Sequence, residues 1–181
     1  MGIFRFKRFD VVNERSAMKV NTDGVLLGAS MTVRETDRRL LDIGTGTGTI
    51  ALMAAQRLVG LDISSLSGND VRIDAIDIDE PSATEAAANF SNSAWSDVLH
   101  AYNVSLDSYA AEIVGPDASY DLIFSNPPYF EESLQAPQER RNNARHTATG
   151  LSYREILDFA SGRLTEQGSV SLVLPADVET A

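Results

Sequence analysis

Four consecutive residues, Asn126, Pro127, Pro128 and Tyr129, have the groups needed to act on an aromatic amine. They follow an apolar run, and because proline lacks a backbone donor and fixes φ, the expected strand must end there in a stiff loop. The lone pair of an exocyclic amine is delocalised into its ring. The side-chain carbonyl of Asn126 and the backbone carbonyl of Pro127 can each accept one amino hydrogen, which exposes that lone pair to an electrophile, while Tyr129 stacks on the ring. Taken alone, the four residues also fit a simple turn.

A glycine-rich turn, Gly44-Thr-Gly-Thr-Gly48, is the second motif with chemical meaning. The apolar residues before it, which include Asp42, predict a buried strand, and the alanine- and leucine-rich residues after it predict a helix. Strand, glycine turn and helix open nucleotide-binding units, since glycine lets the backbone approach a ligand closely. A dinucleotide fingerprint requires glycine at the sixth position, which is Thr49 here, so the spacing favours a ligand without a pyrophosphate.

Asp77 ends the next expected strand. A carboxylate at that position can accept hydrogen bonds from both hydroxyls of a ribose. Asp79 is the second choice, although its place before Pro81 fits the start of a helix better.

Five strands are expected, at residues 40–43, 71–78, 98–104, 120–125 and 170–174. Helices are expected between them, at residues 49–58, 81–90 and 106–113 and from Ser152 through Leu164, with Gly168 ending the following turn. This alternation predicts an α/β fold with a parallel sheet and helices on both faces. The glycine turn, Asp77 and Asn126 then meet at the carboxyl edge of the sheet, where ligands bind in such folds.

The first 39 residues are expected to form an arm and cap in front of a Rossmann-like core at residues 40–175, within one domain. Phe4, Phe6 and Phe9 alternate with basic residues, which suits a short strand with one aromatic face or aromatic platforms beside phosphate-binding cations. Thr22 or Asp23 is expected to cap a short helix beginning near Gly24. Its apolar residues are expected to pack inward: Val25, Leu26 and Leu27.

Charge is unevenly distributed along this acidic chain of 181 residues and net charge −11. Residues 40–139 hold sixteen acidic groups against two basic ones, whereas basic groups gather in the arm and around residues 140–145. A polyanion responds to such local patches more than to the total. There is no membrane-length apolar run, no signal-peptide pattern and no cysteine, and the two histidines lie far apart. We therefore expect a cytoplasmic monomer without a metal site.

The motifs Asp42-Ile-Gly-Thr-Gly-Thr-Gly48, Asp77 and Asn126-Pro-Pro-Tyr129 resemble those of class I S-adenosylmethionine-dependent methyltransferases. Two further segments, Ala17-Met-Lys-Val-Asn-Thr-Asp-Gly-Val-Leu-Leu-Gly-Ala29 and Ala144-Arg-His-Thr147, narrow the resemblance to the tRNA1(Val) (adenine-37-N6)-methyltransferases. It implies S-adenosylmethionine as cofactor, tRNA as partner and methylation of the exocyclic N6 amine of an adenine.

The same resemblance implies roles for individual residues. Cofactor contacts fall to the glycine turn, two carboxylates, the arm and the end of the third strand: Gly44, Gly46, Gly48, Asp42 at the methionine amino group, Asp77 at the ribose, Lys19, Thr22, Asp23 and Ser105, which stands where many relatives carry an acidic residue. Adenine contacts fall to Asn126, Pro127 and Tyr129. Phosphate contacts fall to Arg140, Arg141 and Arg145. The class I fold usually continues with two further strands, so a chain shortened at its C-terminus is expected.

Three other functions fit parts of the sequence. N5-methylation of a protein glutamine uses the same Asn-Pro-Pro-Tyr chemistry, because a carboxamide nitrogen is also delocalised. A catalytically silent fragment that binds cofactor or RNA fits the expected loss of C-terminal strands. A nicotinamide-dependent enzyme is a third alternative, which Thr49 disfavours.

Overall fold

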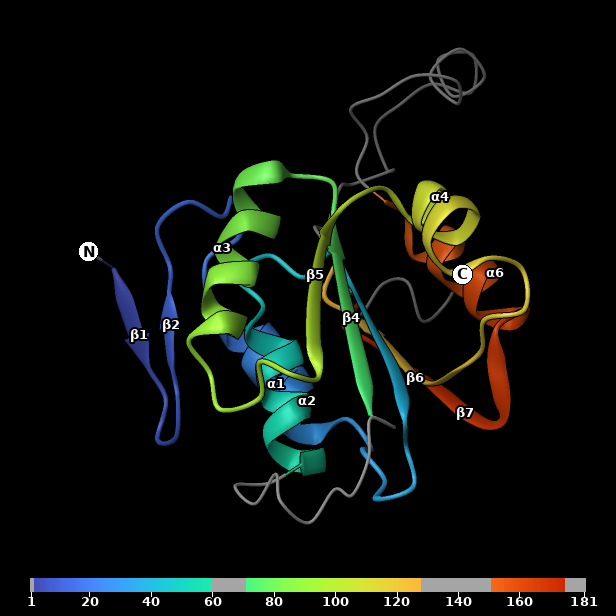
Figure 1. Ribbon diagram of the computed structural model, residues 1–181, viewed down its shortest axis with the longest axis horizontal. Coiled ribbons are helices and arrows are strands. Elements are labelled where there is room, and N and C mark those ends of the chain that lie inside the picture. Colours follow the sequence, from blue (N-terminus) through green and yellow to red (C-terminus); the bar gives the residue numbers. More distant parts are fainter. Residues whose placement is uncertain (1, 60–70, 128–150, 175–181) are drawn as a thin grey trace.

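A five-stranded parallel sheet forms the centre of the protein (Figure 1). The computed structural model describes residues 2–59, 71–127 and 151–174. The sheet order is β5-β4-β3-β6-β7, and every neighbouring pair is parallel. The strands are β3 (Arg39–Ile43), β4 (Arg72–Asp77), β5 (Leu99–Asn103), β6 (Tyr120–Ser125) and β7 (Leu164–Leu172). The predicted α/β fold with five parallel strands is therefore confirmed.

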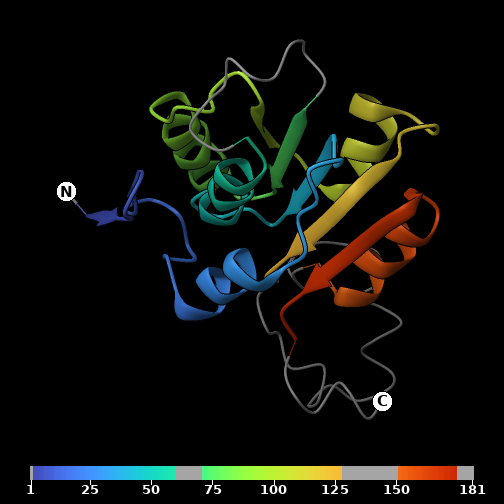
Figure 2. The ribbon, with the colours of Figure 1, turned by 90° about the horizontal axis from the view of Figure 1, so that it is seen from below.

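Helices cover both faces of this sheet (Figure 2). On one face lie α1 (Thr22–Ser30), α2 (Thr49–Val59) and α3 (Glu80–Ser91), and on the other lie α4 (Leu106–Ser108), the π-helix η2 (Tyr109–Val114) and α6 (Tyr153–Ser161). Alternate residues of each central strand enter the two cores; in β3, for example, Leu40 packs in the first and Leu41 in the second. Burial on both faces explains the continuous apolar runs of these strands.

The N-terminal arm begins with a two-stranded antiparallel hairpin, β1 (Ile3–Arg5) and β2 (Asp10–Val12), which lies outside α3 (Figure 1). Its aromatic side chains form a chain of contacts toward the core. Ring centroids are 4.9 Å apart between Phe4 and Phe6, 4.6 Å between Phe6 and Phe9, and 5.8 Å between Phe9 and the buried Trp95. Phe6 and Phe9 therefore serve packing, and Phe4 remains 43% exposed at the outer end.

Helix α1 differs from its prediction in two respects. Asn21, rather than Thr22 or Asp23, is the N-cap, and its side chain accepts a hydrogen bond from the Gly24 backbone N–H. Leu26 points outward and is 59% exposed, because the short helix turns only one narrow stripe toward α2.

Strand β7 begins at Leu164, which was expected to belong to a helix, and Gly168 lies inside the strand instead of ending a turn. The β6–β7 register shifts between the pairs Tyr120–Leu164 and Leu122–Ser169. A Cβ added to Gly168 would lie 2.7 Å from the Tyr120 carbonyl oxygen. The close backbone approach at this bulge therefore requires glycine. In the sequence pattern alone, this glycine resembles a strand breaker. The helix expected at residues 106–113 is likewise divided into α4 and η2.

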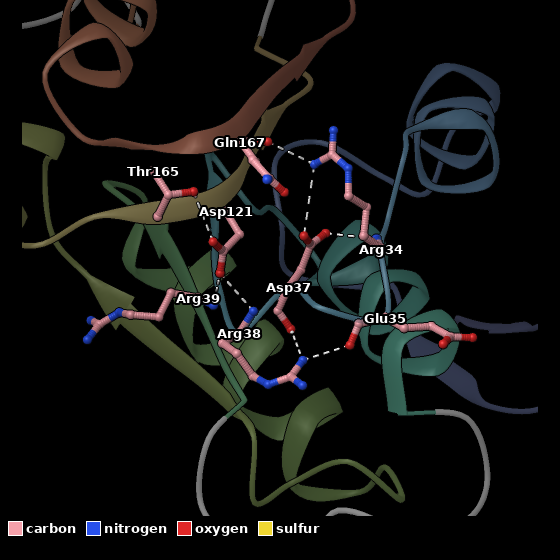
Figure 3. Close-up of polar contacts among 8 residues, drawn as sticks. All are labelled: Arg34, Glu35, Asp37, Arg38, Arg39, Asp121, Thr165 and Gln167. Carbon is pink, nitrogen blue, oxygen red and sulfur yellow. Dashed lines mark hydrogen bonds and ion pairs between the residues drawn. The ribbon is translucent and has the colours of Figure 1, made fainter.

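At the amino edge of the sheet, the Asp121 carboxylate bonds to groups at the starts of neighbouring strands (Figure 3). It accepts hydrogen bonds from the backbone N–H groups of Arg38 at 2.8 Å and Arg39 at 3.0 Å, and from the Thr165 hydroxyl at 3.0 Å. Partial burial acts in the opposite direction, but these hydrogen bonds hold the pKa of Asp121 below its usual value. One side chain therefore links β3, β6 and β7.

A second contact at this edge fixes the segment that enters β3. Buried Asp37 accepts a hydrogen bond from the Arg34 backbone N–H at 2.8 Å, and the Arg34 guanidinium donates to the Gln167 carbonyl of β7 at 3.1 Å (Figure 3). The arginine-rich connector between arm and core is thus held by the sheet that it enters.

We predict that Asp121→Asn lowers the midpoint of thermal unfolding at pH 7 by about 2–4 °C, because the amide oxygen accepts fewer and weaker hydrogen bonds. A carboxylate whose pKa is lowered by folding stabilises the folded protein at pH values above its unfolded pKa, about 3.9. This stabilisation is lost as the pH falls through the folded pKa. The difference between variant and wild type should therefore be smaller at an acidic pH below the unfolded value than at pH 7. Circular dichroism melts at both pH values measure this, and an unchanged difference would contradict the assignment.

Candidate cofactor and substrate site

A cavity lies at the carboxyl edge of the sheet, as the order of the motifs predicted. It contains about 330 Å³ of empty space, a volume that includes space open to solvent. Its walls come from residues 18–21 of the arm, the first turn of α1, the glycine turn, the start of α2 and Asn126. The arm therefore closes one side of a site whose other side is the sheet edge.

The glycine turn between β3 and α2 has a backbone that other residues rarely adopt. Gly44, Gly46 and Gly48 have φ values of 72°, 58° and 79°. A Cβ at Gly48 would lie 2.5 Å from the ring of Phe90, so this glycine permits α3 to pack closely. A Cβ at Gly44 would meet no atom of the described residues within 4 Å. At Gly44 the turn consequently offers its backbone to a ligand.

Asp42 is the most unusual ionisable group of the site. Its side chain is fully buried at the end of β3; Oδ2 accepts a hydrogen bond from the Thr45 hydroxyl at 2.7 Å, and Oδ1 has no hydrogen-bond partner among the described residues. Burial raises the pKa of Asp42 to about 7, and the nearby Asp77 carboxylate adds to this effect. A buried acceptor beside a ligand cavity is suited to a cationic or hydrogen-bond-donating ligand group.

Asp77, at the end of β4, fixes the glycine turn from the neighbouring strand. Its two oxygens accept hydrogen bonds from the backbone N–H groups of Gly46 at 2.8 Å and Asp79 at 2.9 Å. Burial raises its pKa, and these two hydrogen bonds oppose the rise. Each carboxylate oxygen can accept a further bond, so the group can still bind ligand hydroxyls. Asp79 is the N-cap of α3, in agreement with the helix-start interpretation.

Ile78, next to Asp77, was not recognised from the sequence. Its side chain is 78% exposed at the carboxyl end of β4. An isolated exposed isoleucine is ordinary, but one beside a candidate ribose acceptor offers an apolar surface for a ring. The strand pattern could not reveal it, because apolar residues continue to the end of the strand.

Asn126 follows β6 and is 6% exposed at the wall of the cavity. Its Nδ2 lies 3.4 Å from Asn21 Oδ1 and 3.8 Å from Met18 Sδ, whereas its Oδ1 is buried without a hydrogen-bond partner among the described residues. The adjoining Pro127 is also buried. The amide thus has an unused acceptor of the kind predicted for an amine substrate.

The structure brings some predicted residues together and not others. Lys19 lines the cavity, and its Nζ donates to the Glu14 carbonyl oxygen at 2.6 Å. Thr22 and Asp23 lie in the exposed first turn of α1 and, like Ser105, are not part of the described cavity wall; Ser105 is the N-cap of α4. The remaining predicted residues lie outside the described residues: Tyr129, Arg140, Arg141 and Arg145.

Glu85 of α3 holds the arm over the glycine turn and was missed by sequence reasoning. It is 3% exposed, and its carboxylate accepts three consecutive backbone N–H groups, from Glu14 at 2.8 Å, Arg15 at 2.7 Å and Ser16 at 3.2 Å. The Ser16 hydroxyl then donates to the Met18 carbonyl at 2.9 Å. The position of the cavity wall at residues 18–21 therefore depends on a buried side chain of another helix.

Asn89, one turn further along α3, completes this clamp. Its side chain accepts from the Val12 N–H at 2.8 Å and donates to the carbonyls of Val12 at 3.0 Å and Thr47 at 2.9 Å. It thereby joins β2 of the arm to the glycine turn. Polar residues at helical spacing on an alanine-rich helix, here Ser82, Glu85 and Asn89, were the available signal for a buried polar stripe.

Metal binding and membrane insertion find no support in the described part of the chain. Residues 2–59, 71–127 and 151–174 contain no group of three or more histidine, aspartate or glutamate side chains placed to hold a metal ion. None of the helices in these ranges has the length and apolar character needed to cross a bilayer.

We predict that Glu85→Gln lowers the unfolding midpoint by about 5 °C, since an amide replaces a carboxylate that accepts three charge-assisted hydrogen bonds. Backbone amides of residues 12–21 should exchange with deuterium faster than in the wild type. Glu80→Gln, an exposed change on the same helix, is the matched control. Unaltered exchange in Glu85→Gln would show that the arm is held by other contacts.

We predict that Asp42→Asn stabilises the ligand-free protein at pH 8 by several degrees, with little gain at pH 4. The folded pKa of Asp42, about 7, lies above the unfolded value. Because the carboxyl pKa is raised by folding, the folded protein keeps its full stability below about pH 4 and loses part of it as the pH rises through 7. Asparagine does not ionise, so the variant has no such loss. Thermal melts across this range measure the effect; a difference independent of pH would contradict the raised pKa.

Known proteins resemble this chain over most of its length. Residues 15–180 match the family model for the methyltransferase small domain. A tRNA1(Val) (adenine(37)-N6)-methyltransferase of Flavobacterium psychrophilum is 41% identical over 173 residues, which cover 96% of this chain and 68% of that protein. The protein of the same name from Parabacteroides distasonis is 44% identical over 172 residues, covering 95% and 66%. The chain spans about two thirds of the length of these relatives.

The fold has solved counterparts. The crystal structure of an S-adenosylmethionine-dependent methyltransferase from Agrobacterium tumefaciens matches with a TM-score of 0.63, over 97% of this chain and 53% of that chain. At 12% sequence identity this likeness concerns the fold alone, which is the Rossmann-like fold expected from the motifs. The family model and the two relatives confirm the resemblance seen in the sequence. The chain therefore belongs to the methyltransferase small domain family, together with these tRNA1(Val) (adenine(37)-N6)-methyltransferases.

Proposed function

We propose that this chain uses S-adenosylmethionine to methylate the exocyclic N6 amine of an adenine in tRNA, and that the adenine is position 37 of tRNA1(Val). The observation that carries the proposal is the buried Oδ1 of Asn126 at the wall of the cavity, which has no hydrogen-bond partner in residues 2–59, 71–127 and 151–174. The names of the relatives supply the substrate.

Four residues at the carboxyl edge of the sheet support cofactor binding, each with a group suited to one part of the cofactor. Asp42 has a buried oxygen without a hydrogen-bond partner in the described part of the chain, which suits the ammonium of the methionine part. Gly44 leaves open space beside the backbone, and Asp77 retains acceptor capacity for the ribose hydroxyls. Ile78 gives an apolar surface for the adenine ring. When bound, the cofactor supplies an electrophilic methyl group.

The residues of this chain prepare the amine. Asn126 Oδ1 and the Pro127 carbonyl each accept one hydrogen of the N6 amine, so that its lone pair turns toward the methyl donor. Tyr129 stacks on the base, an interaction worth about 1–3 kcal/mol. No basic side chain is needed, because a methylated aromatic amine releases its proton readily to water. Catalysis then consists of positioning and hydrogen-bond polarisation.

The tRNA phosphates are bound by basic groups at the ends of an otherwise acidic chain. This role falls to three arginines that follow the Asn-Pro-Pro-Tyr motif in the sequence: Arg140, Arg141 and Arg145. Lys7 and Arg8, exposed in the turn of the β1–β2 hairpin, add positive charge on the arm. We infer a single methyltransferase domain, with residues 1–39 as arm and cap and residues 40–175 as core, that works as a monomer in the cytoplasm, without a metal ion.

The proposal is tested with the full chain, S-adenosylmethionine and unmodified tRNA1(Val) transcript, followed by digestion to nucleosides and mass spectrometry. N6-methyladenosine should form, and a transcript with guanosine at position 37 should not be methylated. Cofactor binding without N6-methyladenosine would overturn the proposal and favour a silent binding protein. Methylated glutamine on an added release factor would instead assign the alternative reaction.

We predict that Asn126→Ala lowers kcat by at least about 100-fold, as removal of one positioned hydrogen-bonding group does in other enzymes. The cofactor Kd should stay within about threefold, because the amide faces the substrate amine. Asn92→Ala, at the exposed C-terminal end of α3, is the matched asparagine control. A full rate for Asn126→Ala would exclude the proposed role of this side chain.

A further inference from the structure

We propose that Asn21 is a positioning residue that determines which edge of the Asn126 amide faces the substrate amine. The inference rests on the proposed function, since it concerns the acceptor that the amine would meet. Asn21 lies in the arm, 105 positions before Asn126 in the chain, and both line the same cavity.

An asparagine amide has one accepting edge and one donating edge, and only the accepting edge can bind an amino hydrogen. The Nδ2 edge of Asn126 faces two acceptors, Asn21 Oδ1 at 3.4 Å and Met18 Sδ at 3.8 Å. If the amide were flipped, its oxygen would face these acceptors, which would be repulsive. The arm therefore favours the orientation that leaves Asn126 Oδ1 unpaired in the cavity wall.

The orienting oxygen is itself held in place. As N-cap of α1, Asn21 Oδ1 accepts a hydrogen bond from the Gly24 N–H at 2.8 Å, and Asn21 Nδ2 donates to the Lys19 carbonyl at 3.1 Å. Both ends of the Asn21 amide are thus occupied, which excludes its own flip. A single oxygen caps a helix and faces the reactive asparagine, so the start of α1 and the substrate site are fixed together.

The first turn of α1 lies directly against both amides at Gly24. A Cβ built on Gly24 would lie 3.4 Å from Asn21 Oδ1 and 3.6 Å from Asn126 Nδ2, which are ordinary van der Waals distances. The distance of 3.4 Å between Asn126 Nδ2 and Asn21 Oδ1 is long for a hydrogen bond, so the contact is weak. Its proposed effect is to favour one orientation of the Asn126 amide.

Three substitutions separate positioning from helix capping. Asn21→Ser keeps a good N-cap, but its shorter side chain does not reach Asn126. Asn21→Asp keeps the cap and an oxygen facing Asn126. Asn21→Ala removes both functions. Asp121→Asn, at the opposite edge of the sheet, gives a control for loss of stability without a change at the site.

The experiment measures kcat, KM for tRNA, cofactor Kd and unfolding midpoint for each variant. We expect Asn21→Ser to lower kcat about tenfold, with a cofactor Kd within about twofold and a midpoint within about 2 °C of the wild type. Asn21→Asp should keep most of the rate. A wild-type kcat for Asn21→Ser would overturn the proposal. An equal loss of rate in Asn21→Ser and Asn21→Asp would also overturn it, because aspartate retains the acceptor.

A second measurement separates this inference from the proposed function. The side-chain amide protons of Asn126, observed by NMR, should shift in Asn21→Ser much more than in Asn21→Asp. This contact is observed without methyl transfer. If the wild type methylates no tRNA while the shifts follow this pattern, the proposed function fails and the contact stands. If Asn21→Ser leaves the Asn126 signals unchanged, the inference itself is wrong.

Discussion

The parallel pairing of five strands is the constraint on which the rest of this protein depends. Strands buried on both faces can carry few polar groups along their length, so the polar side chains of β3, β4 and β6 lie mainly near the two ends of each strand, with buried Asp74 of β4 as an exception. All three strands end at the same edge because they run in the same direction. Asn126 therefore reaches the cavity wall, and Asp42 and Asp77 lie behind it, where they bond to Thr45 and Gly46 of the glycine turn that lines it.

The edge of the sheet forms only one side of the cavity, and residues 18–21 of the arm form another side. The arm has little secondary structure near the cavity, so its position depends on contacts to other elements. Glu85 and Asn89 of α3 provide these contacts by bonding backbone groups of residues 12–16 and of the glycine turn. Buried side chains of α3 thus fix the position of the cavity wall, although α3 does not line the cavity.

The sequence predicted most of the framework because its signals are local. Apolar runs located the strands, and positive φ values at Gly44, Gly46 and Gly48 agree with the expected turn. Asp79 was correctly placed at a helix start, since an acid before Pro81 has a local meaning.

What could not be predicted depends on partners distant in the chain. The contact between the helix cap Asn21 and Asn126 joins residues 105 positions apart, so it is known only once β6 is placed. The role of Glu85 depends on where the arm passes. Gly168 resembles a strand breaker until the carbonyl of Tyr120 is seen against it.

The buried carboxyl group of Asp42 has a consequence for the thermodynamics of ligand binding. With a pKa of about 7, this group is partly protonated in the ligand-free protein at neutral pH. A cationic ligand group beside it favours the ionised form, so binding releases a fraction of a proton to solution. The observed binding enthalpy then varies with the ionisation enthalpy of the buffer, and affinity increases with pH through the neutral range. On the proposed role of Asp42, occupancy of the site is therefore coupled to proton release.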